Sequence, residues 1–305
     1  MLAFILRRLL TGIPVLIGAT ALSFFIIRIV PGDAVTTLLN GTPTTPEVEA
    51  QLRGQYHLDQ PVLVQYGLYM DDLVQGNFGT SMRSGRPVWS EISARLPSTL
   101  KLTGLSALLT MVLGIGLGIG SSFLDRGPAA RLVALLQYAA VSIPSFWLGL
   151  ILITLFSFRF GWFPATGDRD AKSLILPAVT LALPAAAVIA QLLRDGMDEV
   201  LAEPYIATAR AKGLRERRVR MGHALRNALI PVITVSGTVI GSLLTGSVII
   251  ETVFARPGVG RLAVDAITNK DLPVVQGIVV LAAATYLLIN LAVDLVYALV
   301  DPRIR

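Results

Sequence analysis

Apolar residues form long runs along most of the chain, separated by short polar stretches. A helix that crosses a hydrocarbon core of about 30 Å needs about 20 residues, and six runs reach that length. They are Leu9–Val30, Ser98–Leu124, Leu132–Phe158, Leu174–Leu193, Leu229–Phe254 and Pro273–Val300. The pattern predicts an all-α membrane protein with six transmembrane helices, because backbone polar groups in lipid must be satisfied within their own segment.

The composition agrees with this class. Of 305 residues, 53% are hydrophobic and 15% are charged, and the mean hydropathy is +0.67; an ordinary soluble domain is about 25% charged. The net charge of +6 does not indicate nucleic-acid binding, because the basic residues cluster beside apolar runs and lack an interleaved aromatic platform. The predicted surroundings are membrane lipid. Zero cysteines exclude disulfides and thiolate metal sites.

The runs divide the chain into three parts. Residues 1–30 hold the N-terminus and the first span, residues 31–97 form an external segment, and residues 98–305 form a five-helix core with an interior loop at 194–228. The first run is too long for a signal peptide and no small-residue cleavage site follows it, so we expect an anchored span. Within the external segment we expect helices at Thr45–Tyr56 and Val62–Val74.

The longest polar interruption in the second half is Tyr205–Pro231. Between Arg210 and Arg226 it holds seven basic residues and one acid, Glu216. Short basic loops beside membrane spans lie on the cytoplasmic side. With six spans, both termini are then expected in the cytoplasm.

This stretch opens with a predicted short helix, Tyr205–Lys212. Its small residues are Ala207, Thr208, Ala209 and Ala211. Small side chains let a helix lie close against a partner's groove. Gly213 is the expected C-terminal breaker, and Leu214 begins a second helical stretch. The pattern indicates a docking element; a loop that only sets topology is the alternative.

The spans carry few ionisable residues. Asp294 and Glu251 lie near span ends, whereas an ion-driven porter is expected to bury charges near the midplane. We also find no charged ring or carbonyl filter of a channel. At its span end, Glu251 is a candidate gate residue or a partner for Arg256 or Arg261.

The sequence contains no motif for nucleotide hydrolysis. None of its four lysines follows a glycine and precedes Ser or Thr, as a phosphate-cradling loop requires. Both histidines, His57 and His223, lie in loop-like contexts, and no catalytic constellation is present. We expect no enzyme activity, cofactor or metal on this chain, and a partner ATPase that docks on the polar loop.

Three prolines, Pro144, Pro177 and Pro184, interrupt spans and are expected to bend them. Phe146 and Trp147, after Pro144, are candidates for the translocation path, with lipid-facing or core positions as the alternative. Alternating glycines in the second span form two pairs of Gly-x3-Gly: Gly114, Gly116, Gly118 and Gly120. These predict close helix packing; a contact that moves during transport is the sharper alternative.

The polar loop resembles the cytoplasmic coupling loop of ABC-importer permeases. Ala209, Gly213 and Leu225 match the general pattern, in which Ala207 and Thr208 replace Glu-Ala, and His223 and Arg226 replace Ile and Pro. Further segments are similar to the dipeptide/oligopeptide/nickel class. They are Thr208–Leu214, His223–Pro231, Gly76–Ser81, Arg95–Leu100, Ser142–Gly149, Glu251–Phe254, Pro257–Arg261 and Asp301–Arg305.

This resemblance implies a type I ABC importer permease, similar to the first permease of dipeptide and oligopeptide transporters. It implies a second homologous permease, two ATPase subunits or domains that hold ATP and Mg²⁺, and an external solute-binding protein. The coupling loop would be Tyr205–Leu214, with Arg210 and Lys212 in ionic contact with the ATPase. The location would be a bacterial or archaeal cytoplasmic membrane. Nickel, heme or glutathione are alternative cargoes, and a stand-alone channel or porter is the alternative class.

Overall fold

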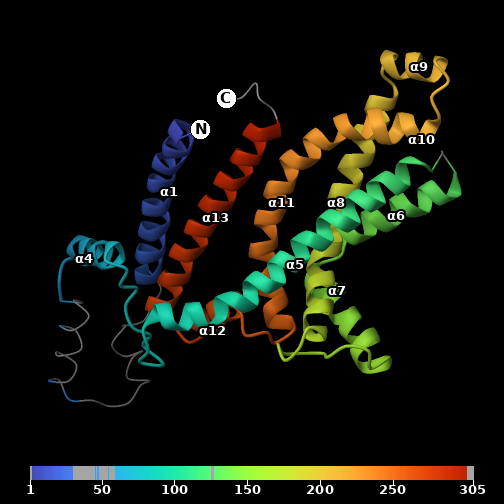
Figure 1. The fold of residues 1–305 in the computed structure, drawn as a ribbon. Helices are drawn as coiled ribbons and strands as arrows, with labels where there is room; N and C mark the ends of the chain where they lie inside the picture. The colour runs from blue at the N-terminus through green and yellow to red at the C-terminus, as the bar shows by residue number, and fades with distance from the viewer. Residues whose placement is uncertain are drawn as a thin grey trace. The chain divides into compact units, whose positions relative to one another are not determined.

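The computed structural model describes residues 2–29, 45, 47, 54, 59–124 and 127–300, and nearly all of the described chain is helical (Figure 1). The helices are α1 Leu2–Ile29, α4 Val62–Val74, α5 Val88–Ser122, α6 Pro128–Ser142, α7 Ser145–Leu152, η1 Ile153–Arg159, α8 Lys172–Leu201, α9 Pro204–Ala211, α10 Glu216–Arg218, η2 Val219–Ala224, α11 Leu225–Val253, α12 Val259–Thr268 and α13 Leu272–Val300. Within these ranges there is no strand, and the all-α prediction is confirmed.

Among the described residues, five helices are long and apolar enough to cross a membrane, and a sixth span results if one bent pair counts as a single crossing. The predicted helix at Val62–Val74 is present as α4. The predicted helix Thr45–Tyr56 falls almost wholly outside the described residues, as does Asp301–Arg305. The sequence did not predict α12, a further short helix after the fifth span.

The third predicted span, Leu132–Phe158, is not one helix. α6 ends at Ser142, and the next helical segment, α7 with η1, runs off at 107°. Ile143 is extended, with φ −77° and ψ 125°, as expected for a residue whose neighbour is a proline. Pro144 precedes α7 and has no N–H with which to continue α6. By contrast, α8 runs on through Pro177 and Pro184.

Contacts divide the chain into two compact units, residues 1–96 with 262–288 and residues 97–261 with 289–305. In the first unit, Val88 and Ile92 at the start of α5 pack against Leu262 and Ala266 of α12 and Val274 of α13. The apolar contact fixes the start of α5 beside these helices.

In the second unit, α8 and α11 lie side by side over much of their length (Figure 1). Near α9, their apolar core joins Leu193 and Met197 of α8 to Ala228 and Val232 of α11. Gly196 lets the two helices come close, since a Cβ there would lie 3.4 Å from the Cβ of Ala228. The two helices therefore form one packed pair.

The glycine pairs of α5 face different surroundings. A Cβ on Gly114 would overlap Ile189 of α8, and one on Gly118 would lie 2.9 Å from the Cβ of Leu193. At Gly116 and Gly120 nothing lies within 4 Å of such a Cβ. Close packing against α8 is thus confirmed for the first pair.

Gly118→Ala should destabilise the protein, because overpacking a tight contact costs about 1–3 kcal/mol. Gly116→Ala is the matched control and should stabilise α5 slightly, since alanine is favoured over glycine in helices by about 1 kcal/mol. The measurement is the melting temperature of the purified protein in detergent. Equal shifts for the two variants would contradict this packing.

Candidate functional site

The short helix at the polar loop, α9, has well-defined ends. Pro204 occupies the first turn, where a missing N–H is no loss. At the other end Gly213 has φ +78°. The Gly213 N–H donates to the carbonyl of Arg210 at 2.9 Å, and the Leu214 N–H donates to the carbonyl of Ala209 at 3.3 Å. This is the two-bond glycine ending of a helix. The prediction that Gly213 ends the helix is confirmed.

α9 has one side against its own chain and one side exposed. Ile206 and Ala209 are buried, at 0% and 9% exposure, and the helix packs on η2. Ala207, Thr208 and Ala211 are exposed. The sequence pattern led us to expect one docking face formed by all four small residues. That expectation is wrong for Ala209, which is buried between α9 and the rest of the chain.

The structure also locates the predicted coupling residues at the two ends of α9. Tyr205 is 43% exposed, and its hydroxyl accepts a hydrogen bond from the Asn227 side chain of α11 at 2.9 Å. Lys212 caps the helix with an exposed side chain, and Leu214 is half-buried. The hydrogen bond of Tyr205 ties the beginning of α9 to the start of α11.

Glu216, the single acid of the basic loop, holds the loop together. Its carboxylate accepts hydrogen bonds from Arg210 at 2.6 and 3.4 Å, and Arg220 lies 3.4 Å from it. The Glu216 carboxylate raises the pKa of the Arg210 guanidinium. Arg220 also donates to the carbonyl of Ser122 and stacks over Phe123 at the end of α5. Arg210 is thus engaged within the chain, and any contact with an ATPase would compete with Glu216.

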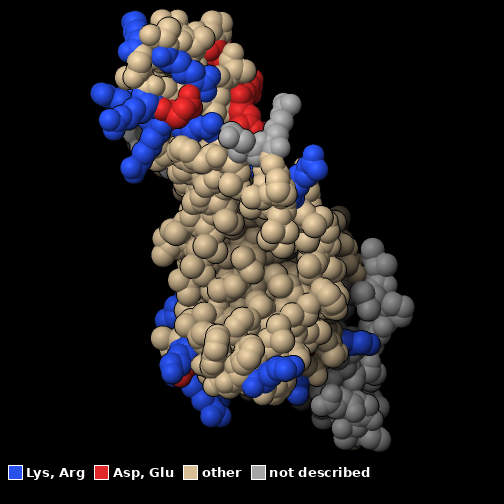
Figure 2. Space-filling view, turned by 90° about the vertical axis from the view of Figure 1, so that its right-hand side faces the viewer, with Lys and Arg blue, Asp and Glu red and all other residues tan. Residues whose placement is uncertain are grey.

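The surface around α9 and α10 is densely basic (Figure 2). Its exposed members are Lys212, Arg215, Arg217, Arg218 and Arg226. The figure also shows a broad band below them without charged side chains. His223 belongs to η2 and is exposed; its context is helical rather than a loop, because η2 continues directly into α11.

At the far end of α11, Glu251 has no exposed surface. Its carboxylate accepts a hydrogen bond from the Thr99 hydroxyl at 2.6 Å and from the Arg261 N–H at 3.1 Å. A Cβ on Gly258 would overlap this carboxylate, and one on Gly260 would lie 2.9 Å from Oε2. The two glycines of the motif Pro257–Arg261 therefore let its backbone lie close against the Glu251 carboxylate. In this conformation Glu251 faces no open path.

Arg256 lies in the same region and is also fully buried. Its guanidinium bonds to Asp168 at 2.8 Å and to the Ser98 hydroxyl at 3.2 Å. It also donates to the carbonyls of Gly167 and Ser173 at 3.3 and 3.2 Å. Its ionic partner is therefore Asp168, which the sequence did not indicate. We call Ser98, Thr99, Asp168, Glu251 and Arg256 the Arg256 network.

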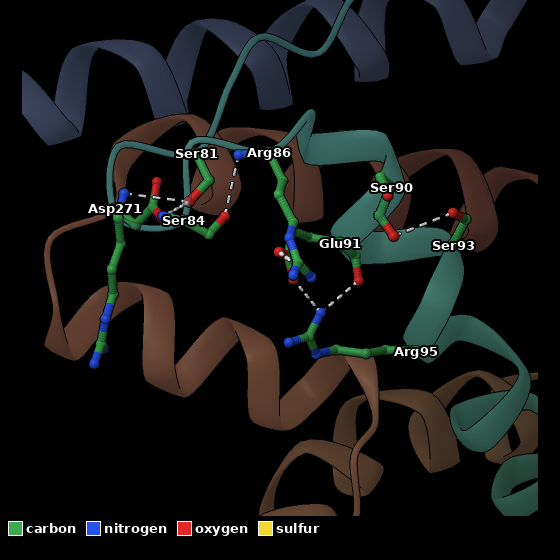
Figure 3. Close-up of polar contacts among 9 residues, drawn as sticks. Ser81, Ser84, Arg86, Ser90, Glu91, Ser93, Arg95 and Asp271 are labelled. Carbon is green, nitrogen blue, oxygen red and sulfur yellow. Dashed lines mark hydrogen bonds and ion pairs between the residues drawn. The ribbon is translucent and has the colours of Figure 1, made fainter.

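The first unit holds a second polar cluster (Figure 3). The Ser81 hydroxyl donates to Asp271, and the Met82 N–H donates to the same carboxylate at 3.1 Å. Nearby, Arg95 binds both the carbonyl and the carboxylate of Glu91. An open cavity of about 510 Å³ is bordered by Ser81, Glu91, Arg95 and Asp271. Ser81 ends the motif Gly76–Ser81 and Arg95 begins the motif Arg95–Leu100, and both side chains line this cavity.

The other candidates for the translocation path lie elsewhere. Pro144 precedes α7, and Phe146 and Trp147 are 46% and 49% exposed in its first turn. The structure does not bring them to Glu251, and their role stays a prediction. Among the described residues, no group of three or more His, Asp or Glu side chains is placed to hold a metal ion.

Long apolar helices, with α8 packed against α11 and the exposed short helix α9 between them, are the features of a multi-pass membrane protein. The chain belongs to the binding-protein-dependent transport system inner membrane component family, whose model matches residues 111–305. The N-terminal model of the same systems matches residues 1–103. It is an inner-membrane permease of an ABC transporter.

Similar proteins span its full length. The glutathione transport system permease protein GsiC of Salmonella typhimurium is 42% identical over 305 residues, covering 100% of this chain and 99% of that protein. The di/tripeptide transport system permease protein DppB of Pseudomonas aeruginosa is 40% identical over 339 residues, with the same coverage. An inward-facing structure of the MetNI methionine ABC transporter matches with a TM-score of 0.60 at 21% identity, covering 68% of this chain and 95% of that one. The last match shows the type I importer fold.

Gly213→Ala should loosen the end of α9, because a left-handed backbone costs a residue with a Cβ about 1–2 kcal/mol. Gly222→Ala is the matched control: neither position has an atom within 4 Å of a new Cβ, but only Gly213 of the two has a positive φ. Trypsin should cut the Arg-rich loop faster in the first variant alone. Equal cutting rates would mean that Gly213 does not fix the loop.

Proposed function

We propose that this chain is the first permease subunit of an ATP-driven importer of dipeptides and oligopeptides. The observation that carries the proposal is the 40% identity to a di/tripeptide permease over the full chain. The 42% identity to a glutathione permease supports a second cargo, glutathione, which is itself a tripeptide. Nickel and heme are further cargoes of the class, without a specific observation in their favour.

The proposed assembly contains a second homologous permease, two ATPase subunits or domains and an external solute-binding protein. ATP and Mg²⁺ would bind on the ATPase subunits. The exposed side of α9, with Ala207, Thr208 and Ala211, supports docking, because short side chains admit a partner's surface closely. The surrounding unpaired arginines, such as Arg217, supply charge for an acidic rim on that partner.

The proposed mechanism is mechanical. ATP binding closes the ATPase pair, and α9 follows the surface on which it docks. α9 connects the end of α8 to η2 and α11, and the packing of Met197 and Ala228 joins those helices. A displacement of α9 therefore moves α8 and α11 as a pair, and hydrolysis resets them.

The proposal sets the orientation. The basic loop would lie in the cytoplasm of a bacterium or archaeon, together with both termini. The Arg256 network would then lie at the outer end of the bundle. A stand-alone channel or porter remains the rival class, and it would transport solute without ATP.

Ala207→Trp should abolish ATP-driven uptake of labelled dipeptide in cells that carry the whole transporter, because a large ring on the exposed side of α9 blocks close docking. Membrane insertion should be unchanged, since an exposed substitution alters stability by only about 0.5 kcal/mol. The measurement is dipeptide uptake, with labelled glutathione in parallel to rank the two cargoes.

Ala129→Trp is the control: Ala129 is also exposed, at the start of α6, but lies outside α9. It should keep uptake near the wild-type rate. Normal uptake by the Ala207→Trp variant would contradict the docking role of α9. Uptake of neither peptide by the unaltered transporter would contradict the cargo.

A further inference from the structure

Helix α4 has an apolar side without a partner among the described residues. It has 13 residues, too few to cross a membrane, which takes about 20. Leu63 and Val74 are 76% and 83% exposed, and the exposed Gly67 lies between them on the same side of the helix, at the spacing of an apolar stripe. Asp72 is on the opposite side and is exposed.

α4 is attached to the middle of α1 by polar contacts. The Tyr66 hydroxyl lies 3.1 Å from the Thr20 hydroxyl and donates to the carbonyl of Ile17 at 3.3 Å. The Thr20 hydroxyl also contacts the sulfur of Met70 at 3.6 Å. These contacts fix the position of α4 along α1.

Aromatic rings complete the attachment. The ring of Phe24 on α1 stacks on Tyr69 with centroids 5.7 Å apart and meets the edge of Tyr66 at 5.2 Å. Phe24 is 3% exposed, whereas its neighbour Phe25 is 37% exposed. One side of α4 is therefore committed to α1, and the stripe of Leu63 and Val74 points elsewhere.

The level of this attachment decides what surrounds the stripe. The apolar span of α1 runs from Leu6 to Ile26. Ile17 lies nine residues before the end of that span, and Thr20 six residues. At 1.5 Å per residue, the contacts of Tyr66 lie about 9–14 Å inside the end of the span. The surface of α1 on both sides of this level exposes apolar residues, including Ile17 at 46% and Leu22 at 63%.

We infer that α4 is an interfacial membrane helix, with Leu63 and Val74 in contact with lipid acyl chains. A helix satisfies its own backbone groups and is tolerated at this depth, and a short amphipathic helix is suited to the boundary of headgroups and acyl chains. Its C-terminal end is polar and exposed: Gln75 donates to Asp71 at 2.8 Å, and Asn77 donates to Asp72 at 3.0 Å. Lipid, rather than a protein partner, is the occupant because the stripe continues the bilayer-facing surface of α1.

The absence of cysteine allows a direct test. Single variants Leu63→Cys, Val74→Cys and Asp72→Cys receive an environment-sensitive fluorophore, and the full transporter is reconstituted in phosphatidylcholine vesicles. Quenching is measured with lipids brominated on the acyl chain and separately with aqueous iodide. Leu22→Cys in the span and Arg169→Cys in the loop before α8 serve as the lipid and water references, both being exposed.

The expected result is loss of emission with brominated lipid at positions 63 and 74, as strong as at position 22. Position 72 should respond to iodide, as position 169 does. Two results would overturn the inference. Iodide quenching of positions 63 and 74 equal to that of position 72 would place the stripe in water. Protection of positions 63 and 74 from both quenchers would show that protein covers it.

Discussion

The burial of Arg256 and Glu251 is the constraint on which the second unit depends. Both side chains are fully buried, and a buried charge is tolerated only when ion pairs and hydrogen bonds replace its water. Asp168 and Ser98 do so for Arg256, and Thr99 does so for Glu251. Loss of one partner of such a pair costs about 3–5 kcal/mol. The far end of α11 is therefore held to α5 and to the segment before α8.

The two ends of the α8–α11 pair are held by different forces. At the Arg256 network, buried polar bonds allow little displacement. At α9, the ion pair of Arg210 with Glu216 is solvent-exposed, with side chains 42% and 51% exposed, and exposed pairs contribute only about 0–1 kcal/mol. Near α9 the helices are therefore held mainly by their apolar core, and the polar contacts that the proposed docking would displace are weak.

Local rules predicted the elements that depend on local chemistry. Apolar run length gave the spans, and the turn preference of glycine gave the end of α9 at Gly213. At Pro144 the sequence predicted a bend within one span, whereas the structure has a 107° break between two helices. A proline inside an apolar run is compatible with a mild kink as well, so its presence does not give the angle. The pairing of Thr99 with Glu251 and of Asp168 with Arg256 was missed, since no local pattern links residues so far apart. Ala209 was misplaced because small residues surround the whole helix, so composition does not indicate which side is buried.

The proposed docking of α9 on an ATPase in the cytoplasm underlies the whole mechanism. It is tested most directly by attaching a photoactivated cross-linker to Ala207→Cys in this otherwise cysteine-free chain, within membranes that carry the whole transporter, and identifying the product by mass. The account predicts a cross-link to the ATPase subunit and none from Leu22→Cys, which lies in the span. A permease that remains free of ATPase at Ala207, while transport proceeds, would contradict it.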